Sequence, residues 1–220
     1  VIETVLSFVA NSMSYIRIAA FCIAHAAFAM AVHEMLRISA TLGIGLGLIL
    51  KPIQILWMNL VTDSLPAAGL GVEPPEPGIM ERPPRKPGER ILTRRTMAHL
   101  ALTGLIGGLL AILLYRMFEV KGVFYASTVA FSFLVFFQLL HSLNCKSESL
   151  SLLKVGVLSN KYLLLSIFIS WLLQLMAIYV APWFFETVYL SITDFMAITL
   201  FGAVIILVEE LRKAVGVTVK

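Results

Sequence analysis

Long apolar stretches with few charged side chains recur along this chain of 220 residues. A helix that crosses a lipid bilayer needs about 20 mostly apolar residues, and six stretches meet this requirement. We expect spans at 16–35, 53–72, 99–115, 124–143, 162–180 and 190–208. These stretches are continuous and do not alternate strictly between apolar and polar residues, which argues against a β-barrel. The sequence therefore predicts a single all-α integral membrane bundle of six transmembrane helices.

The composition agrees with a membrane protein. The chain is 59% hydrophobic and 14% charged, whereas ordinary soluble domains are about 45–50% apolar and about 25% charged. Such a chain has too few charged side chains to cover the surface of a soluble fold. Its two cysteines, Cys22 and Cys145, form no CxxC pair, so we expect free thiols and no disulfide framework.

One segment between the predicted spans is rich in proline. Residues 73–95 contain six of the nine prolines, which excludes a helix interior, and we expect an aqueous loop over 73–98. Short loops rich in Lys and Arg lie on the cytoplasmic side of a membrane. With six spans, thirteen basic residues fall on the side of this loop and four on the other. This distribution predicts that both termini are cytoplasmic. It also explains the net charge of +4 without a nucleic-acid partner.

The second predicted span contains the strongest local signal. Asn59, Thr62 and Asp63 stand three and four positions apart, so in an α-helix they lie on one face within about 60°. A charged group at bilayer depth costs roughly 2.5–3.5 kcal/mol, so Asp63 needs a partner. Carboxylate, amide and hydroxyl oxygens are the ligands that calcium prefers. The alternative is polar contact between helices, with Asp63 protonated or paired to a neighbour.

A proline follows this polar cluster. Pro66 has no N–H and cannot donate to the carbonyl of Thr62, four positions earlier. A helix broken in this way exposes carbonyl oxygens, which are tolerated at membrane depth only where they line a cavity or bind an ion. In the later spans, Gly104, Gly107 and Gly108 favour close helix packing, and we expect Gln174 to bond a neighbouring helix.

Two segments carry a family resemblance. Residues 52–85 read PIQILWMNLVTDSLPAAGLGVEPPEPGIMERPPR, and residues 133–149 read FLVFFQLLHSLNCKSES. They resemble the sixth and eighth transmembrane helices of type II P-type cation ATPases, the group that contains the endoplasmic-reticulum, secretory-pathway and plasma-membrane calcium pumps. A weaker likeness to the C-terminal end of the family lies at Asp194 and around Glu209. The resemblance covers about residues 50–215. It implies the C-terminal transmembrane domain of such a pump, from the fifth to the tenth helix.

The resemblance also implies a set of metal ligands. In family terms, Asn59, Thr62 and Asp63 are cation ligands of the sixth helix. Gln138 takes the eighth-helix position at which some calcium pumps carry a glutamate. An amide oxygen there offers a ligand without a charge.

Other polar residues near these positions have two explanations. His141 and Ser142 share the face of Gln138, but contacts within the core explain them at least as well. The fifth helix of the family carries an Asn and a Glu three residues apart, and neither of two possible registers of this sequence restores that pair. One register makes Glu34 a further ligand candidate. Glu34 and Arg37 also fit an exposed ion pair at the outer end of the first span.

The motifs of the family's catalytic domains do not occur in these 220 residues. The sequence has no DKTG, TGE, GDGxND or PEGL segment and no Walker A pattern. We therefore expect no ATPase activity from this chain by itself. We expect P-type ATPase catalytic domains as partners, on the same or another chain. The first residue is Val1, so we expect either a trimmed start or a piece of a longer protein.

These observations define one leading hypothesis and two alternatives. In the leading hypothesis the chain is the membrane, ion-binding portion of an ATP-driven cation pump, with calcium as the transported ion and no intrinsic cofactor. Manganese, sodium and potassium stay open as the ion. The first alternative is a stand-alone scaffold or regulatory subunit derived from such a domain. The second is a passive channel or secondary carrier.

Overall fold

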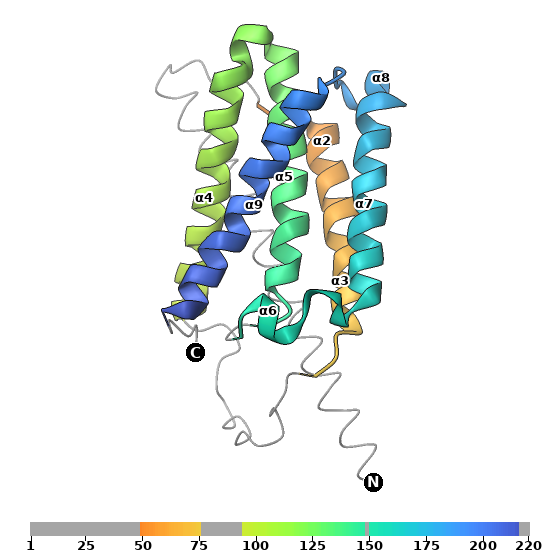
Figure 1. The fold of residues 1–220 in the computed structure, drawn as a ribbon. Coiled ribbons are helices and arrows are strands. Elements are labelled where there is room, and N and C mark those ends of the chain that lie inside the picture. Colours follow the sequence, from red (N-terminus) through yellow and green to blue (C-terminus); the bar gives the residue numbers. More distant parts are fainter. Residues whose placement is uncertain (1–48, 76–93, 148–149, 216–220) are drawn as a thin grey trace.

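The computed structural model describes residues 49–75, 94–147 and 150–215, apart from the side chains of Thr62 and Asp63. Every regular element in these residues is a helix (Figure 1). Four helices are long and apolar enough to cross a membrane. They are α4 (Arg94–Phe118), which continues into η3 (Glu119–Lys121), α5 (Val123–Asn144), α7 (Lys161–Tyr179) and α9 (Ile192–Ala214). These four helices coincide with the last four predicted spans, and the first predicted span, 16–35, lies outside the described residues.

The second predicted span consists of three consecutive helical segments. They are the α-helix α2 (Pro52–Met58), the π-helix η1 (Asn59–Asp63) and the α-helix α3 (Ser64–Gly71). Together they run alongside α7 (Figure 1). Pro52 stands in the first turn of α2, where a missing N–H does no harm. The backbone N–H of Lys51 donates to Oε1 of Gln54 at 3.0 Å and fixes the start of this helix.

Helix α5 forms the centre of the bundle. Of its apolar stretch, 78% is buried, against 39% for α4, 33% for α7 and 28% for α9. It packs against α3, α4, α7 and α9, and side chains of these neighbours complete the hydrophobic core. Gly104, Gly107 and Gly108 of α4 are all buried, which agrees with the predicted close packing.

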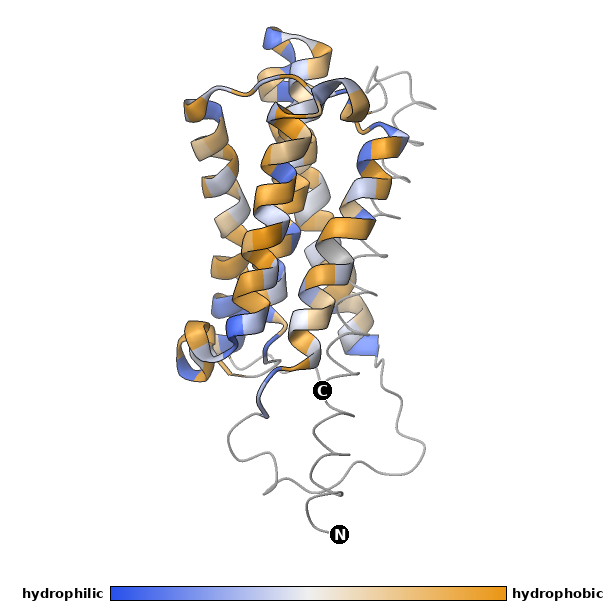
Figure 2. Ribbon diagram, turned by 90° about the vertical axis from the view of Figure 1, so that its right-hand side faces the viewer, coloured by the Kyte–Doolittle hydropathy of each residue, from blue (hydrophilic) through white to orange (hydrophobic). Residues whose placement is uncertain are grey.

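The outward faces of the bundle are apolar as well. Large exposed apolar side chains recur at intervals of three, four or seven residues along the three outer helices. They are Leu102, Leu105, Leu109 and Leu113 on α4, Leu165, Phe168, Leu172 and Met176 on α7, and Met196, Leu200, Leu207 and Leu211 on α9. Hydrophilic residues gather mainly at the two ends of the bundle (Figure 2). Helices that are apolar both inside and outside are surrounded by lipid, so the chain is an integral, multi-pass membrane protein.

Short connections close the two ends of the bundle. At one end, α6 (Leu152–Val155) and η4 (Val157–Ser159) join α5 to α7. At the other, η3 joins α4 to α5, and α8 (Pro182–Phe185) lies between α7 and α9. Helix α4 begins at Arg94, inside the predicted loop 73–98. Residues 94–98 contain no proline, so nothing in their covalent structure prevents the helix from extending beyond its apolar part.

Candidate functional site

The π-helical segment Asn59–Asp63 lies within the second predicted span. A carbonyl in a π-helix pairs with the N–H five residues later. The residue five positions after Val61 is Pro66, which has no N–H. The hydroxyl of Ser170 on α7 donates to the carbonyl oxygen of Val61 at 3.2 Å instead. The interruption that Pro66 predicts is therefore present, and a neighbouring helix bonds a backbone oxygen inside it.

The three candidate ligands of the second span all fall in this segment. Asn59 begins the π-helix, Asp63 ends it, and Thr62 lies between them. Asn59 is exposed, while the side chains of Thr62 and Asp63 are outside the described part of the structure. The angular spacing predicted for an α-helix does not carry over, because a π-helical turn is wider. That these residues bind a cation stays a prediction.

The fourth candidate, Gln138, is a buried residue of α5. Helix α5 contacts both the π-helical segment and α3, so the helix that carries Gln138 adjoins the other candidates. Of its neighbours, Ser142 donates to the carbonyl of Leu139 in its own helix at 2.6 Å, which favours the core explanation for this residue. His141 is also buried. Glu34 lies outside the described residues.

A metal centre of the His, Cys or carboxylate type is not formed by the described residues, since no three such side chains converge among them. A cation bound at the π-helical segment would instead use amide, hydroxyl and backbone carbonyl oxygens, together with the carboxylate of Asp63. Such oxygen-rich sites suit hard cations such as calcium.

A buried ion pair lies just beyond the end of α3. The side chains of Glu73 and Lys146 are each 1% exposed, with Lys146 Nζ 3.6 Å from Glu73 Oε1. Lys146 Nζ also donates to the carbonyl of Gly156 at 2.7 Å and to the hydroxyl of Ser159 at 2.7 Å. The prediction of an aqueous loop from residue 73 was therefore wrong for Glu73. Its partner lies far away in the sequence, in the connection after α5, and lets the carboxylate be buried.

Asn160 joins this ion pair to the helices on both sides. Its Nδ2 donates to Glu73 Oε2 at 2.7 Å and to the carbonyl of Gly69 at 2.8 Å. Its Oδ1 accepts from the backbone N–H of Leu163 at 2.9 Å and caps α7. At Gly69 the helices are so close that an added Cβ would lie 2.7 Å from the Cα of Leu163. The end of α3 is thereby fixed against the start of α7.

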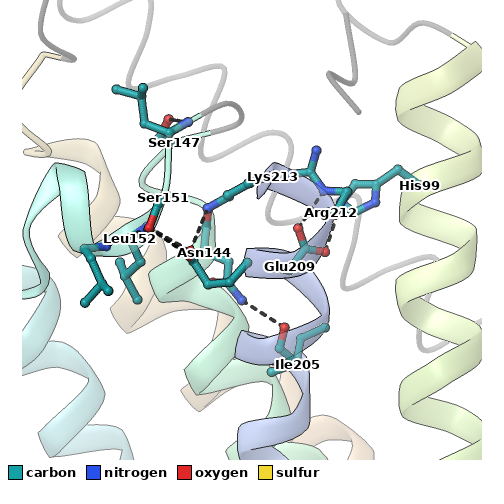
Figure 3. Close-up of polar contacts among 12 residues, drawn as sticks. His99, Asn144, Ser147, Ser151, Leu152, Ile205, Glu209, Arg212 and Lys213 are labelled. Carbon is teal, nitrogen blue, oxygen red and sulfur yellow. Dashed lines mark hydrogen bonds and ion pairs between the residues drawn. The ribbon is translucent and has the colours of Figure 1, made fainter. Parts of the chain in front are cut away.

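A second polar cluster joins α4, α5 and α9 at the same end of the bundle (Figure 3). Glu209 is 2% exposed. One of its carboxylate oxygens lies 3.2 Å from Nε2 of His99, and the other accepts from Nε of Arg212 at 2.9 Å. Close by, Asn144 on α5 donates to the carbonyl of Ile205 on α9 at 3.5 Å.

The last turn of α9 also binds the connection after α5. Glu210 accepts from the hydroxyl of Ser151 at 2.5 Å and from the backbone N–H of Leu152 at 2.8 Å. Lys213 lies 3.8 Å from Glu210 and donates to the carbonyl of Asn144 at 3.4 Å. Charged residues that follow the last predicted span thus hold the helix ends together.

Polar groups at the opposite end of the bundle are also paired. Lys121 donates to Asp194 at 2.7 Å, and the hydroxyl of Tyr125 bonds the same carboxylate. Gln54, fully buried near the start of α2, donates through Nε2 to the carbonyl of Phe185 at 3.0 Å. These contacts connect α2, α5 and α9 to the turns between them.

Sequence reasoning missed Glu73, Asn160 and the function of Glu209 in the packing. The sequence does hold a signal for Glu73, because this residue directly follows the predicted span 53–72 and precedes the prolines of the loop. Asn160 stands one residue before a long apolar run, which is the usual position of an N-cap. Neither observation identifies a partner, which only the fold supplies.

The fold and the interrupted helix define a multi-pass membrane domain with polar groups held inside it. The family described as "Cation transporting ATPase, C-terminus" matches residues 47–215, more than half of the chain. The chain belongs to this family.

Several curated relatives match most of the chain. It is 37% identical over 172 residues to the calcium-transporting ATPase of Bacillus subtilis, a match that covers 76% of this chain and 19% of that protein. It is 36% identical over 170 residues to calcium-transporting ATPase 1 of Saccharomyces cerevisiae, with 74% and 18% covered. With calcium-transporting ATPase type 2C member 2 of Mus musculus the identity is 35% over 170 residues, with 74% and 18% covered. The chain thus spans about a fifth of the length of these relatives.

Proposed function

We propose that this chain supplies the cation-binding membrane portion of an ATP-driven calcium pump. The observation that carries the proposal is the π-helical interruption at Asn59–Asp63, which coincides with the amide, hydroxyl and carboxylate residues that resemble the cation ligands of the family. Three relatives are named for calcium transport. The ligands proposed are Asn59, Thr62, Asp63 and Gln138, with Glu34 as a further candidate.

The proposal assigns nucleotide binding and phosphorylation to other domains, on the same or another chain. The part of the relatives that this chain matches is about a fifth of their length. The motifs of the phosphorylated aspartate and of nucleotide binding do not occur in the 220 residues. Within this division of labour, the chain binds the ion and the partner domains drive its release.

We test the proposal by equilibrium binding of calcium-45 to the natural gene product that contains these residues, reconstituted in lipid nanodiscs. Saturable binding is expected, with competition by unlabelled calcium and with much weaker competition by sodium or potassium, because a carboxylate with neutral oxygens favours a divalent ion. Manganese as a competitor measures the selectivity between divalent ions. A chain that binds no calcium, manganese, sodium or potassium would be a scaffold or regulatory subunit, and the proposal would fail.

The same proposal includes six spans with both termini in the cytoplasm. Helices α2, η1 and α3 together supply 20 residues, or about 30 Å at the rise of an α-helix, enough for a fifth span beside the four described. The basic residues support the orientation. Lys146, Lys154 and Lys161 belong to the end of the bundle at which α9 terminates, whereas Arg116 and Lys121 belong to the other end.

Cysteine labelling measures this orientation. Val120 in η3 is 94% exposed and Leu153 in α6 is 82% exposed, at opposite ends of the bundle. In a variant without the native cysteines, Val120→Cys should react with a membrane-impermeant maleimide in sealed cells, and Leu153→Cys only after permeabilisation. Labelling of Leu153→Cys in sealed cells would place the C-terminal end outside and reject the orientation.

A further inference from the structure

Gln174 lies on the face of α7 that packs against the interrupted helix. The buried polar and small residues of α7 are Ser166, Ser170, Gln174 and Ala177, spaced three or four positions apart, so they share one face. Ser166 adjoins Gly69 of α3, and Ser170 bonds the carbonyl of Val61 in the π-helix. The two helical runs are therefore antiparallel (Figure 1). By this antiparallel pairing, Gln174, one turn beyond Ser170 on the same face, falls opposite residues that precede Val61.

The amide of Gln174 is buried without a partner in the described protein. The residue is 0% exposed, and neither Oε1 nor Nε2 forms a hydrogen bond. Within the part of the chain that the structure describes, the expected bond to a neighbouring helix is therefore not made. Gln54, also buried in this bundle, does have hydrogen-bond partners. Its Nε2 donates to the carbonyl of Phe185 and its Oε1 accepts from the backbone N–H of Lys51. An amide that is left without hydrogen bonds in an apolar interior is costly.

The two polar atoms of this amide define the hydrogen-bond partners that it needs. Oε1 needs a donor and Nε2 needs an acceptor, and a single water molecule provides both. Backbone carbonyls beside the amide are suitable further partners for such a water. In the π-helical segment the pattern of backbone pairing is altered, and Pro66 removes one N–H from it. The hydroxyl of Ser170 already satisfies one of these carbonyls from the same face of α7.

We propose that Gln174 holds an ordered water against the π-helical segment and so positions the cation ligands of that segment. The predicted effect on ion binding rests on the proposed function, whereas the presence of the water does not. Gln174 acts through the water and the backbone, and is a positioning residue. The proposal explains why a polar residue of this size occupies the buried face of an apolar helix.

The test compares Gln174→Leu with wild type in the natural gene product that contains this chain, in lipid nanodiscs. Calcium-45 binding should weaken about tenfold, the loss expected when one hydrogen-bonded link is removed. The melting temperature should stay close to that of wild type, because the apolar side chain removes the amide together with the water that completes it. Ser166→Ala is the matched control on the same face, because among the described residues its hydroxyl bonds within its own helix, to the carbonyl of Leu163 at 2.7 Å. It should bind calcium like wild type.

Two further measurements make the outcome decisive. Gln174→Met, with a more flexible side chain, should also bind weakly while melting like wild type. Solid-state NMR should show transfer of magnetisation from ordered water to the Nε2 protons of Gln174 in wild type. Wild-type affinity in Gln174→Leu, a loss of melting temperature in both variants, or no transfer from water would each overturn the proposal. A wild-type protein that binds no cation would reject the proposed function, while the NMR measurement still decides whether the water is present.

Discussion

Lys146→Met is expected to destabilise the bundle by about 3–5 kcal/mol, the cost of removing one member of a buried ion pair. The substitution leaves the carboxylate of Glu73 buried without its ammonium partner. It also removes the donor to the carbonyl of Gly156 and to the hydroxyl of Ser159. Thermal unfolding in nanodiscs, followed by circular dichroism, should show a lower midpoint for this variant.

Three further variants distinguish the loss of the ion pair from a general effect of losing a lysine. Lys154→Met is the matched control, because Lys154 is an exposed residue of the same connection, and surface substitutions usually change stability by about 0.5 kcal/mol or less. Glu73→Gln should cost less than Lys146→Met, since the amide oxygen of the new side chain can still accept from Asn160. The double variant Glu73→Gln with Lys146→Met should recover part of the loss, because it leaves no unpaired charge.

A particular result would contradict this interpretation. If Lys146→Met melts like Lys154→Met, the buried pair contributes nothing to the closure of the bundle. If the double variant is as unstable as the sum of the two single variants, the two charges do not interact. Either result would remove the argument that the end of α3 is fixed by Glu73.

The sequence predicts the spans well because their signal is local. α4, α5, α7 and α9 are each a continuous apolar run, and the structure places them within a few residues of the expected limits. The interruption near Pro66 is also local in origin, since proline removes an N–H wherever it stands. Its form as a π-helix over Asn59–Asp63 is not predictable from the same residues. A donor to the carbonyl of Val61 comes from Ser170 of α7, a contact that no local pattern indicates.

Contacts between distant residues account for what the sequence does not predict. Glu73 precedes a run of prolines and reads as part of an aqueous loop, but Lys146 and Asn160 surround it in the fold. Glu209 follows the last predicted apolar span, but His99 and Arg212 make it a buried link between α4 and α9. In both cases residue type alone indicates exposure, and a partner distant in the sequence allows the side chain to be buried.

Asp63→Asn is expected to abolish cation binding while leaving the protein folded. Asparagine has the volume of aspartate and keeps one side-chain oxygen, but it lacks the charge. A divalent ion that sheds part of its water needs that charge to replace the lost hydration. Asn59→Ala and Thr62→Ala each remove one neutral oxygen, so each should weaken binding less, by about tenfold. Calcium-45 binding and a thermal melt on each variant provide the measurement.

If Asp63 has a structural role instead of a ligand role, the variants should rank differently in calcium binding and in melting temperature. If Asp63 is protonated and only bonds a neighbouring helix, asparagine imitates it well, and both calcium binding and the melting temperature should be close to wild type. Normal binding by Asp63→Asn would therefore reject its assignment as a ligand. A large fall in melting temperature would point to folding instead, and Asp63→Glu, which keeps the charge and lengthens the side chain, then distinguishes the two cases. A ligand carboxylate moved by one methylene should change the selectivity between calcium and the larger or smaller divalent ions, because coordination depends on the size of the site.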